Sequence, residues 1–189
     1  MKVRIYPDPV LKKKALPVAD IDQEILSVLE QMKNVMIQGD GIGLAAPQVG
    51  IDKRLIVINN EVIIKVMSDA LDSDDIADKQ EVFVYKMINP EITWRSEERS
   101  IGNEGCLSLP GSYCDVERAS SVSVRFLDER GETQNITTTK LLAVCVQHEI
   151  DHLDGILFID RISNLKRRLL LDKYKKQNNG LRQGVVKLL

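Results

Sequence analysis

The stretch KLLAVCVQHEIDHLDG, residues 140–155, contains both histidines of this 189-residue chain, His148 and His152, four positions apart. Apolar residues occur on all sides of the helix that this stretch predicts, which indicates a central, buried helix. Residues four apart lie on one helical face, about 6 Å from each other, so both imidazoles can bind one cation. Glu149 lies next to that face, where it can hydrogen-bond a metal-bound water and act as general base and proton shuttle. The alternative is a pair of exposed or core histidines that bind nothing.

A catalytic metal site of this kind needs a third protein ligand and one open position. The extended motif H-E-x-x-H-x-x-G-x-x-H of one protease class is excluded, because Phe158 stands in place of its last histidine. A downstream glutamate ligand is also excluded, because no Glu occurs after Glu149. Upstream thiolates remain, and Cys106 lies in the turn-like stretch NEGCLSLPG, residues 103–111, where Gly and Pro can bring it to the helix.

Two further cysteines are weaker ligand candidates. Cys145 precedes His148 by three residues on the same helix face, but we expect it to line a pocket wall or to pack in the core. Cys114 has no supporting context, and we expect it to be structural. A rival interpretation is a nucleic-acid-binding zinc module that uses Cys106, Cys114 and both histidines. It is disfavoured, because seven residues separate these cysteines instead of roughly two to four, and the glutamate would have no role.

A glycine-rich turn, GIGLAAPQVG, occupies residues 41–50. Its Gly41, Gly43 and Ala46 also fit the dinucleotide-binding pattern G-x-G-x-x-A. That pattern should follow a strand and open a helix, whereas here a predicted helix precedes it and Pro47 follows. A dinucleotide-binding enzyme is therefore disfavoured.

Three stretches resemble the signature motifs of peptide deformylases, in the same order along the chain: GIGLAAPQVG (41–50), EGCLSLPG (104–111) and QHEIDHLDGILF (147–158). Weaker likeness extends from the RIYPDPVL start into the C-terminal helix. The resemblance implies a hydrolase that removes the N-formyl group from the formyl-methionine of new polypeptides and releases formate. It also implies iron(II) as the native ion, with nickel or cobalt as active replacements and zinc usually less active. A soft thiolate ligand is compatible with both iron and zinc.

The resemblance also implies a role for individual motif residues. A side-chain amide that helps to bind an oxyanion typically changes the rate by about 10² to 10³. The implied roles are metal ligand for Cys106, His148 and His152, acid/base for Glu149, and oxyanion binding for Gln48 and the backbone N–H of Leu107.

Substrate selectivity should come from an apolar slot beside the metal that receives the unbranched methionine side chain. Helix residues one or two turns before His148 share its face, and Ile42 can complete the slot, although each apolar residue can equally belong to an ordinary core. Gly43 lets the backbone approach the substrate closely. Arg118 is expected to be a structural or substrate contact. The expected substrate contacts are Ile42, Gly43, Gly105, Leu141, Val144 and Cys145.

The rest of the pattern predicts an α+β fold, with mixed, mainly antiparallel sheets packed around the H-E-x-x-H helix and with a C-terminal helix. The first helix should run from Ile21 to Met36, with Asp20 and Gln23 as a capping box and Gly39 as its stop. Predicted strands cover residues 54–58, 81–94, 121–128 and 133–139, and predicted helices cover about 139–155 and about 163–180.

Residues 59–80 are expected to form a solvated, acidic loop, because five Asp occur between Ser68 and Asp78. This stretch is longer than usual between the first two motifs of the family that the chain resembles. We assign no chemistry to it, since its Asp spacing lacks the Gly of a calcium-binding loop.

Composition favours one soluble domain over residues 1–189, since 43% of the residues are apolar, which is enough for a core. Three cysteines at irregular spacing do not indicate a disulfide framework and suit a reducing cytoplasm. The resemblance to bacterial-type deformylases implies a bacterial cytoplasm. The N-terminus lacks the apolar region of a secretory signal, and no apolar run reaches the roughly 18 residues of a membrane span. We therefore expect no membrane partner.

Charge is distributed unevenly along the chain. The net charge is -2, but residues 161–189 carry nine Lys/Arg against the single Asp172, so this segment is +8 and the remainder is -10. The chain as a whole has no polyanion-binding signature, and no DNA partner is expected. The basic C-terminal helix is typical of a solvated helix face. The alternative is docking on ribosomal RNA near the exit tunnel, where the implied substrate emerges.

Overall fold

The computed structural model describes residues 1–71, 83–177 and 185–186, and side chains in the last turns of the second helix, residues 66–71, are not described. The helices are α1 (Gln23–Gln38), α2 (Asn60–Leu71), α3 (Lys140–Leu153) and α4 (Asn164–Gln177), with short 3-10 helices η1 (Pro9–Lys12), η2 (Ala46–Val49) and η4 (Phe158–Asp160). The strands are β1 (Val3–Arg4), β2 (Gly43–Ala45), β3 (Leu55–Asn59), β4 (Val84–Arg95), β5 (Arg99–Cys106), β6 (Leu109–Ala119), β7 (Ser121–Leu127), β8 (Thr133–Thr139) and β9 (Val185–Val186).

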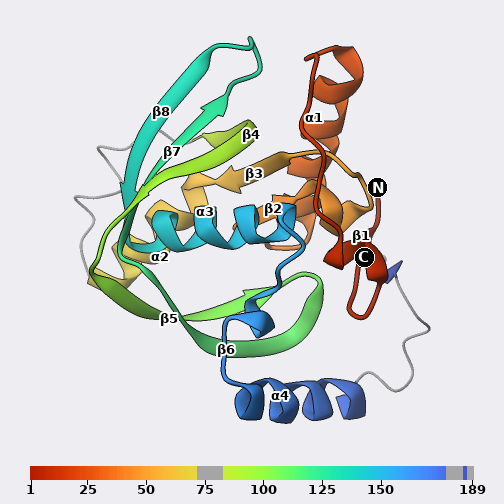
Figure 1. Ribbon diagram of the computed structural model, residues 1–189, viewed down its shortest axis with the longest axis vertical. Helices are drawn as coiled ribbons and strands as arrows, with labels where there is room; N and C mark the ends of the chain where they lie inside the picture. Colours follow the sequence, from red (N-terminus) through yellow and green to blue (C-terminus); the bar gives the residue numbers. More distant parts are fainter. Residues whose placement is uncertain (72–82, 178–184, 187–189) are drawn as a thin grey trace.

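Helix α3 runs through the middle of the molecule, between a five-stranded sheet and the β5–β6 hairpin (Figure 1). The larger sheet has the order β2-β3-β4-β7-β8, and its neighbouring strands are antiparallel. Ten of the fourteen residues of α3 are buried. The predicted α+β class, with antiparallel sheets around a central helix and a further C-terminal helix, is therefore confirmed.

Strand β3 explains how the sheet joins two cores. Ile56 and Ile58 belong to the core on the α3 side, whereas Leu55 and Val57 belong to the core on the α1 side. Because both faces are covered, the strand has an unbroken apolar sequence rather than an alternating one. A third core lies between β6, η4 and α4 and contains Tyr174.

Helix α1 forms where the apolar periodicity predicts it, but its cap differs from the prediction. The Asp22 carboxylate accepts a hydrogen bond from the Ile25 backbone N–H at 2.9 Å, so Asp22 is the N-cap and the predicted capping box from Asp20 is wrong. The helix begins at Gln23, which places Ile25 at the third helical position, within reach of this carboxylate. The predicted stop, Gly39, is the C-cap.

The acidic loop prediction is wrong for residues 60–71, which form α2. Ile63 and Ile64 are buried, Ile63 within the core on the α3 side of the sheet. The Asn59 side chain accepts a hydrogen bond from the Glu61 backbone N–H at 3.0 Å at the start of the helix. Two adjacent apolar residues and a capping amide outweigh the surrounding charge. Most of the predicted aspartate-rich segment, 72–80, lies outside the described residues.

The β5–β6 hairpin is the largest element that the sequence pattern did not predict. Its strands pair from Arg99 with Ala119 to Gly105 with Tyr113, and a register shift then sets Cys106 opposite Leu109. Cys106 therefore ends a strand that turns sharply, rather than lying in an isolated turn. Helices α3 and α4 begin as predicted, and the predicted end of α4 lies outside the described residues. None of the described helices has the length and apolar character that crossing a membrane demands.

Candidate active site

Three potential metal ligands converge at the centre of the molecule. Helix α3 contributes His148 and His152, and the end of β5 contributes Cys106, with their ligand atoms all within 4.8 Å of one another. Cys106 Sγ lies 3.2 Å from His152 Nε2. One thiol and two imidazoles at this spacing form a donor set that suits a transition-metal ion. The cluster therefore fits one cation.

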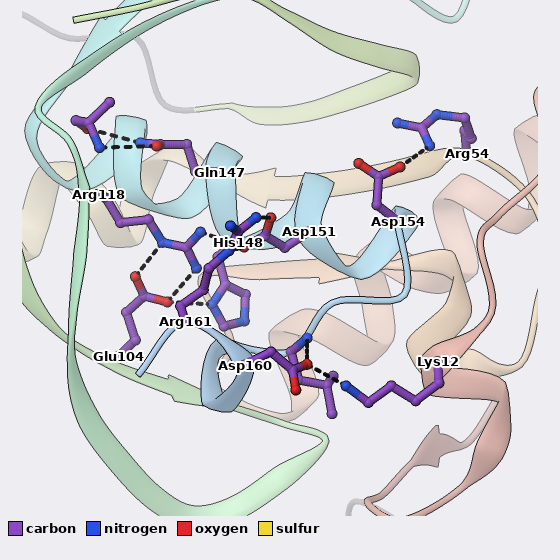
Figure 2. A network of polar contacts seen from close by, with 12 residues as sticks. Lys12, Arg54, Glu104, Arg118, Gln147, His148, Asp151, Asp154, Asp160 and Arg161 are labelled. Carbon is purple, nitrogen blue, oxygen red and sulfur yellow. Dashed lines mark hydrogen bonds and ion pairs between the residues drawn. The ribbon is translucent and has the colours of Figure 1, made fainter. Parts of the chain in front are cut away.

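A buried carboxylate orients His148. The Nδ1 atom of His148 lies 2.8 Å from Oε2 of Glu104 on β5. Arg118 on β6 donates to the same carboxylate from Nε at 2.7 Å and from Nη2 at 2.9 Å (Figure 2). Burial alone would raise the pKa of Glu104, but the hydrogen bonds from Arg118 and His148 outweigh it and lower the pKa to about 2. A charged Glu104 accepts a hydrogen bond from Nδ1–H of His148, which leaves Nε2 of that ring available to a cation.

The two imidazoles differ in their affinity for protons. Burial, assisted by the charge of His148, lowers the pKa of His152 well below its ordinary value, so this ring is neutral. Burial would also lower the pKa of His148, but its hydrogen bonds to Cys106 and Glu104 outweigh burial and raise the pKa. A neutral imidazole is the form that binds metal, so a proton competes with a cation at His148 more strongly than at His152.

Glu149 lies beside the cluster with a carboxyl group that is poorly satisfied. Its side chain is buried, and Oε2 has no hydrogen-bond partner among the described residues. Burial raises the pKa of Glu149 to about 7. A carboxyl group with such a pKa can both accept and return a proton near neutral pH.

Gly43 on β2 leaves the space that Glu149 occupies. A Cβ atom at position 43 would overlap the Glu149 carboxylate. The sequence predicted that this glycine permits close approach of the backbone to a substrate. In the structure, the missing side chain at Gly43 makes room for the Glu149 carboxylate. Gly43 also lines the cavity, and its contact with a substrate stays a prediction.

Gln48 connects the glycine-rich turn to the cluster. Its Oε1 accepts a hydrogen bond from the Ala45 backbone N–H at 2.7 Å, and its Nε2 lies 3.3 Å from both Cys106 Sγ and Ser108 Oγ. The side chain is 1% exposed. The amide is thus fixed at its oxygen, and its NH₂ group faces the cluster.

A cavity of about 500 Å³ opens beside the cluster. Its lining includes two glycine-containing segments, residues 39–43 and 103–107, together with residues of α3. Burial raises the pKa of the Cys145 thiol, so Cys145 contributes a neutral wall. The predicted site residues that line the cavity are Ile42, Gly43, Gln48, Gly105, Cys106, Leu107, Leu141, Val144, Cys145, His148 and Glu149.

Some residues at this site were not predicted. Tyr113 lines the cavity and packs on Gly105, where a Cβ atom would overlap its ring. Glu104 was quoted as part of a motif but received no role, although it orients a histidine. Arg118 was expected to be a structural or substrate contact, and its side chain is buried in ion pairs with Glu104 and Asp151. The sequence predicted a turn over residues 103–111 and no hairpin. The ion pair between Glu104 and Arg118 depends on the register of that hairpin, so it was not predicted.

Comparison with known proteins gives the family. The sequence profile described as polypeptide deformylase matches residues 1–168 of the chain. The chain belongs to the polypeptide deformylase family. Peptide deformylases are metal-dependent hydrolases that act at the N-terminus of nascent polypeptides, and a Cys/His/His cluster that could bind a metal is consistent with this activity.

Curated and solved deformylases cover almost the whole chain. The peptide deformylase of Bartonella bacilliformis is 40% identical over 184 residues, which is 96% of each chain. That of Rhizobium meliloti is 42% identical and covers 91% of this chain and 90% of its own. The crystal structure of the Ehrlichia chaffeensis deformylase has a TM-score of 0.81 at 32% identity and covers 95% of this chain and 97% of that chain. A Synechococcus elongatus deformylase in complex with actinonin has a TM-score of 0.76 at 42% identity, covering 90% of this chain and 85% of that chain.

Proposed function

We propose that this chain hydrolyses the N-formyl group of formyl-methionine at the start of new polypeptides, releasing formate and a free amino group. Cys106, His148 and His152 would hold one divalent cation. The observation that carries the proposal is the convergence of their ligand atoms within 4.8 Å beside Glu149, a buried carboxyl group of which one oxygen has no partner among the described residues. When bound, the cation supplies Lewis acidity, which makes water a stronger nucleophile near neutral pH.

Glu149 moves the proton in this proposal. With a pKa of about 7 it can accept a proton from the attacking water and return it to the departing amine. Both transfers occur in the cavity, into which its carboxyl group opens. The Glu149 carboxyl group can lie beside the cavity because Gly43 has no side chain.

Gln48 and the backbone N–H of Leu107 would stabilise the oxyanion of the tetrahedral intermediate. The Gln48 Nε2 atom is 3.3 Å from both Cys106 Sγ and Ser108 Oγ, so a formyl oxygen bound beside Cys106 can accept a hydrogen bond from Nε2 in place of one of these contacts. The bond from Ala45 to Oε1 fixes which end of the amide faces the substrate. Such a preorganised donor carries no charge and costs no reorganisation during the reaction.

The methionine side chain of the substrate would pack against the apolar wall of the cavity. Leu141, Val144 and Cys145 lie one to two turns before His148 on α3, and Ile42 faces them from the glycine-rich turn. Gly43 and Gly105 also line the cavity, with Glu149 and Tyr113 packed where their side chains would be, so an extended peptide would meet their backbone groups. These six residues are the substrate contacts that we infer.

Iron(II) is the cation that we propose in the cell. A thiolate beside two imidazoles is a donor set of intermediate softness, which binds iron, cobalt, nickel and zinc.

The bacterial deformylases to which the chain is similar support a bacterial cytoplasmic location for this protein. Their alignments cover nearly the whole chain, which supports one domain over residues 1–189.

Ribosome docking through α4 is a further part of the proposal. This helix carries Lys166, Arg168, Lys173, Lys175 and Lys176 as exposed residues. Of its fourteen residues only Tyr174 is buried, so the basic side chains are free to meet a polyanion. Phosphate contacts of this kind are attractive at low salt and need no deep pocket.

The enzymatic proposal is tested with Glu149→Ala. Turnover of formyl-Met-Ala-Ser, measured by formate release, should fall by about 10² to 10⁴, while elemental analysis finds one cation per chain as in the wild type. The control is Glu132→Ala, which removes an exposed carboxylate of the turn before β8 and should not change turnover. Full activity of the metal-loaded Glu149→Ala protein would contradict the proposal.

A further inference from the structure

A row of four alternating charges extends from His148 to the surface of the protein. Glu104 contacts His148, Arg118 contacts Glu104, and Asp151 accepts a hydrogen bond from Arg118 Nη1 at 2.5 Å. Arg161 ends the row, with Nε 3.0 Å from Asp151 Oδ2 and Nη2 2.5 Å from Asp151 Oδ1. Figure 2 shows Arg118 between the two carboxylates.

Arg161 balances the charge of this row. Glu104, Arg118 and Asp151 are 5%, 4% and 7% exposed, so they form a buried group with two carboxylates and one guanidinium. The second guanidinium comes from Arg161, whose side chain is 43% exposed. A buried charge without a counterion is costly, so the group needs this fourth member.

Loss of Arg161 would alter the contacts nearer to the cluster. Arg118 donates two hydrogen bonds to Glu104 and one to Asp151. Without Arg161, Arg118 would be the only guanidinium for both carboxylates, and Asp151 would attract it away from Glu104. Glu104 would then hold the His148 ring less firmly. Hydrogen-bond partners of ligand imidazoles fix ring orientation and ligand basicity.

We propose that Arg161 is a positioning residue of the metal centre, acting through Asp151, Arg118 and Glu104 to hold His148 in the orientation that binds the cation. The inference rests on the metal centre of the proposed function and extends it to a residue outside the described lining of the cavity. Arg161 lies between η4 and α4, so it also links the C-terminal segment to the centre.

The size of the effect follows from the distance of Arg161 from the ligand. Direct hydrogen-bond partners of metal ligands change metal affinity by about 10- to 100-fold, so we expect about 3- to 10-fold for a residue three side chains removed from the ligand. Because Arg161 is partly exposed, its removal should leave the fold intact.

Arg167 provides a matched control. Its Nη1 atom lies 3.2 Å from Asp160 Oδ1, and its side chain is 37% exposed. It is therefore an arginine of similar exposure that pairs with a carboxylate of the same segment, but it has no place in the row. Arg167→Ala should remove a surface ion pair without affecting the metal centre.

The experiment measures how fast the folded protein loses metal. Wild type, Arg161→Ala, Arg161→Lys and Arg167→Ala are loaded with cobalt(II) without oxygen, and the visible absorption of bound cobalt is followed after a chelator is added. We expect about 3- to 10-fold faster loss from Arg161→Ala, an intermediate rate from Arg161→Lys, and the wild-type rate from Arg167→Ala. Thermal unfolding of the same samples separates metal loss from loss of fold, because a merely structural role would lower the melting temperature without accelerating metal loss.

Two results would overturn the inference. One is a wild-type rate of metal loss from Arg161→Ala, and the other is equal acceleration in Arg161→Ala and Arg167→Ala. If the wild type bound cobalt and released formate while either result was found, the inference would fail alone. A wild-type protein that bound no cobalt would overturn the proposed function and the inference together.

Discussion

Helices α3 and α4 have the same length but opposite surroundings. Ten of the fourteen residues of α3 are buried, whereas α4 buries only Tyr174. Helix α3 lies between the sheet and the β5–β6 hairpin, and α4 lies on the outer side of that hairpin (Figure 1). Asp151 on α3 is paired with Arg118 and Arg161 in a largely dry environment, whereas most charged side chains of α4 are exposed to solvent.

This difference determines how each helix can contribute to function. On α3, a group such as Glu149 has its pKa moved to about 7 by burial, and His148 is oriented by a charged partner. Such effects are strong because the local dielectric constant is low. On α4, charges act through the solvent and are screened by salt. We therefore expect changes on α3 to affect stability and chemistry, and changes at the exposed positions of α4 to affect only association.

Removal of Arg118 should have the largest effect. Arg118→Ala leaves Glu104 without its guanidinium partner and weakens the pairing of Asp151, which should lower the free energy of unfolding by about 3 to 5 kcal/mol. Lys173→Ala, at an exposed position of α4, should change it by less than about 0.5 kcal/mol. Urea unfolding of the metal-free proteins, followed by circular dichroism, makes the comparison. Equal losses in the two variants would mean that the buried ion pairs around α3 stabilise the fold no more than the exposed charges of α4 do.

The pH dependence of stability should identify Glu104 as a charged, buried partner. Its pKa is lowered from 4.5 to about 2 in the folded protein, so its contribution is complete above about pH 4.5 and is lost as the pH falls towards 2. That shift corresponds to about 3 to 4 kcal/mol at most. The difference in unfolding free energy between wild type and Glu104→Gln, both metal-free, should therefore shrink over this range. A difference that stays constant from pH 5 to pH 2 would refute the assignment.

Gly43→Ala should damage catalysis more than stability. The added Cβ would overlap the Glu149 carboxylate and displace it, and a displacement of about 1 Å typically costs about 10²-fold in rate. Gly102→Ala is the control, because a Cβ there meets no atom within 4 Å. Formate release from formyl-Met-Ala-Ser should fall in the first variant alone. Wild-type turnover by Gly43→Ala would show that catalysis does not depend on the observed position of the Glu149 carboxylate.

Charge reversal on α4 should have the smallest effect on the enzyme. Lys175→Glu with Lys176→Glu should leave turnover of the short peptide unchanged and weaken pelleting with ribosomes at low salt, with the difference disappearing at high salt. Arg95→Glu with Arg99→Glu, at exposed positions of β4 and β5, makes the same charge change away from α4. Equal pelleting by the two double variants would argue against docking through α4.

The central helix and the family were predictable from the sequence because their determinants are local. H-E-x-x-H spacing, the glycine-rich turn and the Cys106 motif each fit within a dozen residues. The cap of α1 was misplaced by two residues, because Asp20 and Asp22 are both acceptable caps and only the helix start distinguishes them. Helix α2 was not predicted, because the aspartates between Ser68 and Asp78 indicated a solvated loop and the two isoleucines that prove to be buried gave too weak a helical signal.

The ion pairs around His148 were not predictable. Glu104 and Arg118 lie 14 residues apart and pair only because of the β5–β6 register, and Glu104 reaches His148 across 44 residues. From the sequence alone, charged residues so far apart are expected to be exposed at the surface and not paired with one another. The hairpin itself has weak alternation, and its register shift beside Cys106 leaves no simple periodicity. Long-range pairing, rather than local pattern, determines these contacts.

The most direct test of the account is a metal titration. Anaerobically purified protein is stripped of metal and titrated with iron(II), and formate release from formyl-Met-Ala-Ser is measured at each step, with Cys106→Ser and His148→Ala in parallel. We predict that wild-type activity rises in proportion to bound iron and saturates at one ion per chain, and that both variants bind iron weakly and stay inactive. Full activity of the metal-free protein, or full iron binding by both variants, would contradict the claim that Cys106, His148 and His152 hold the catalytic cation.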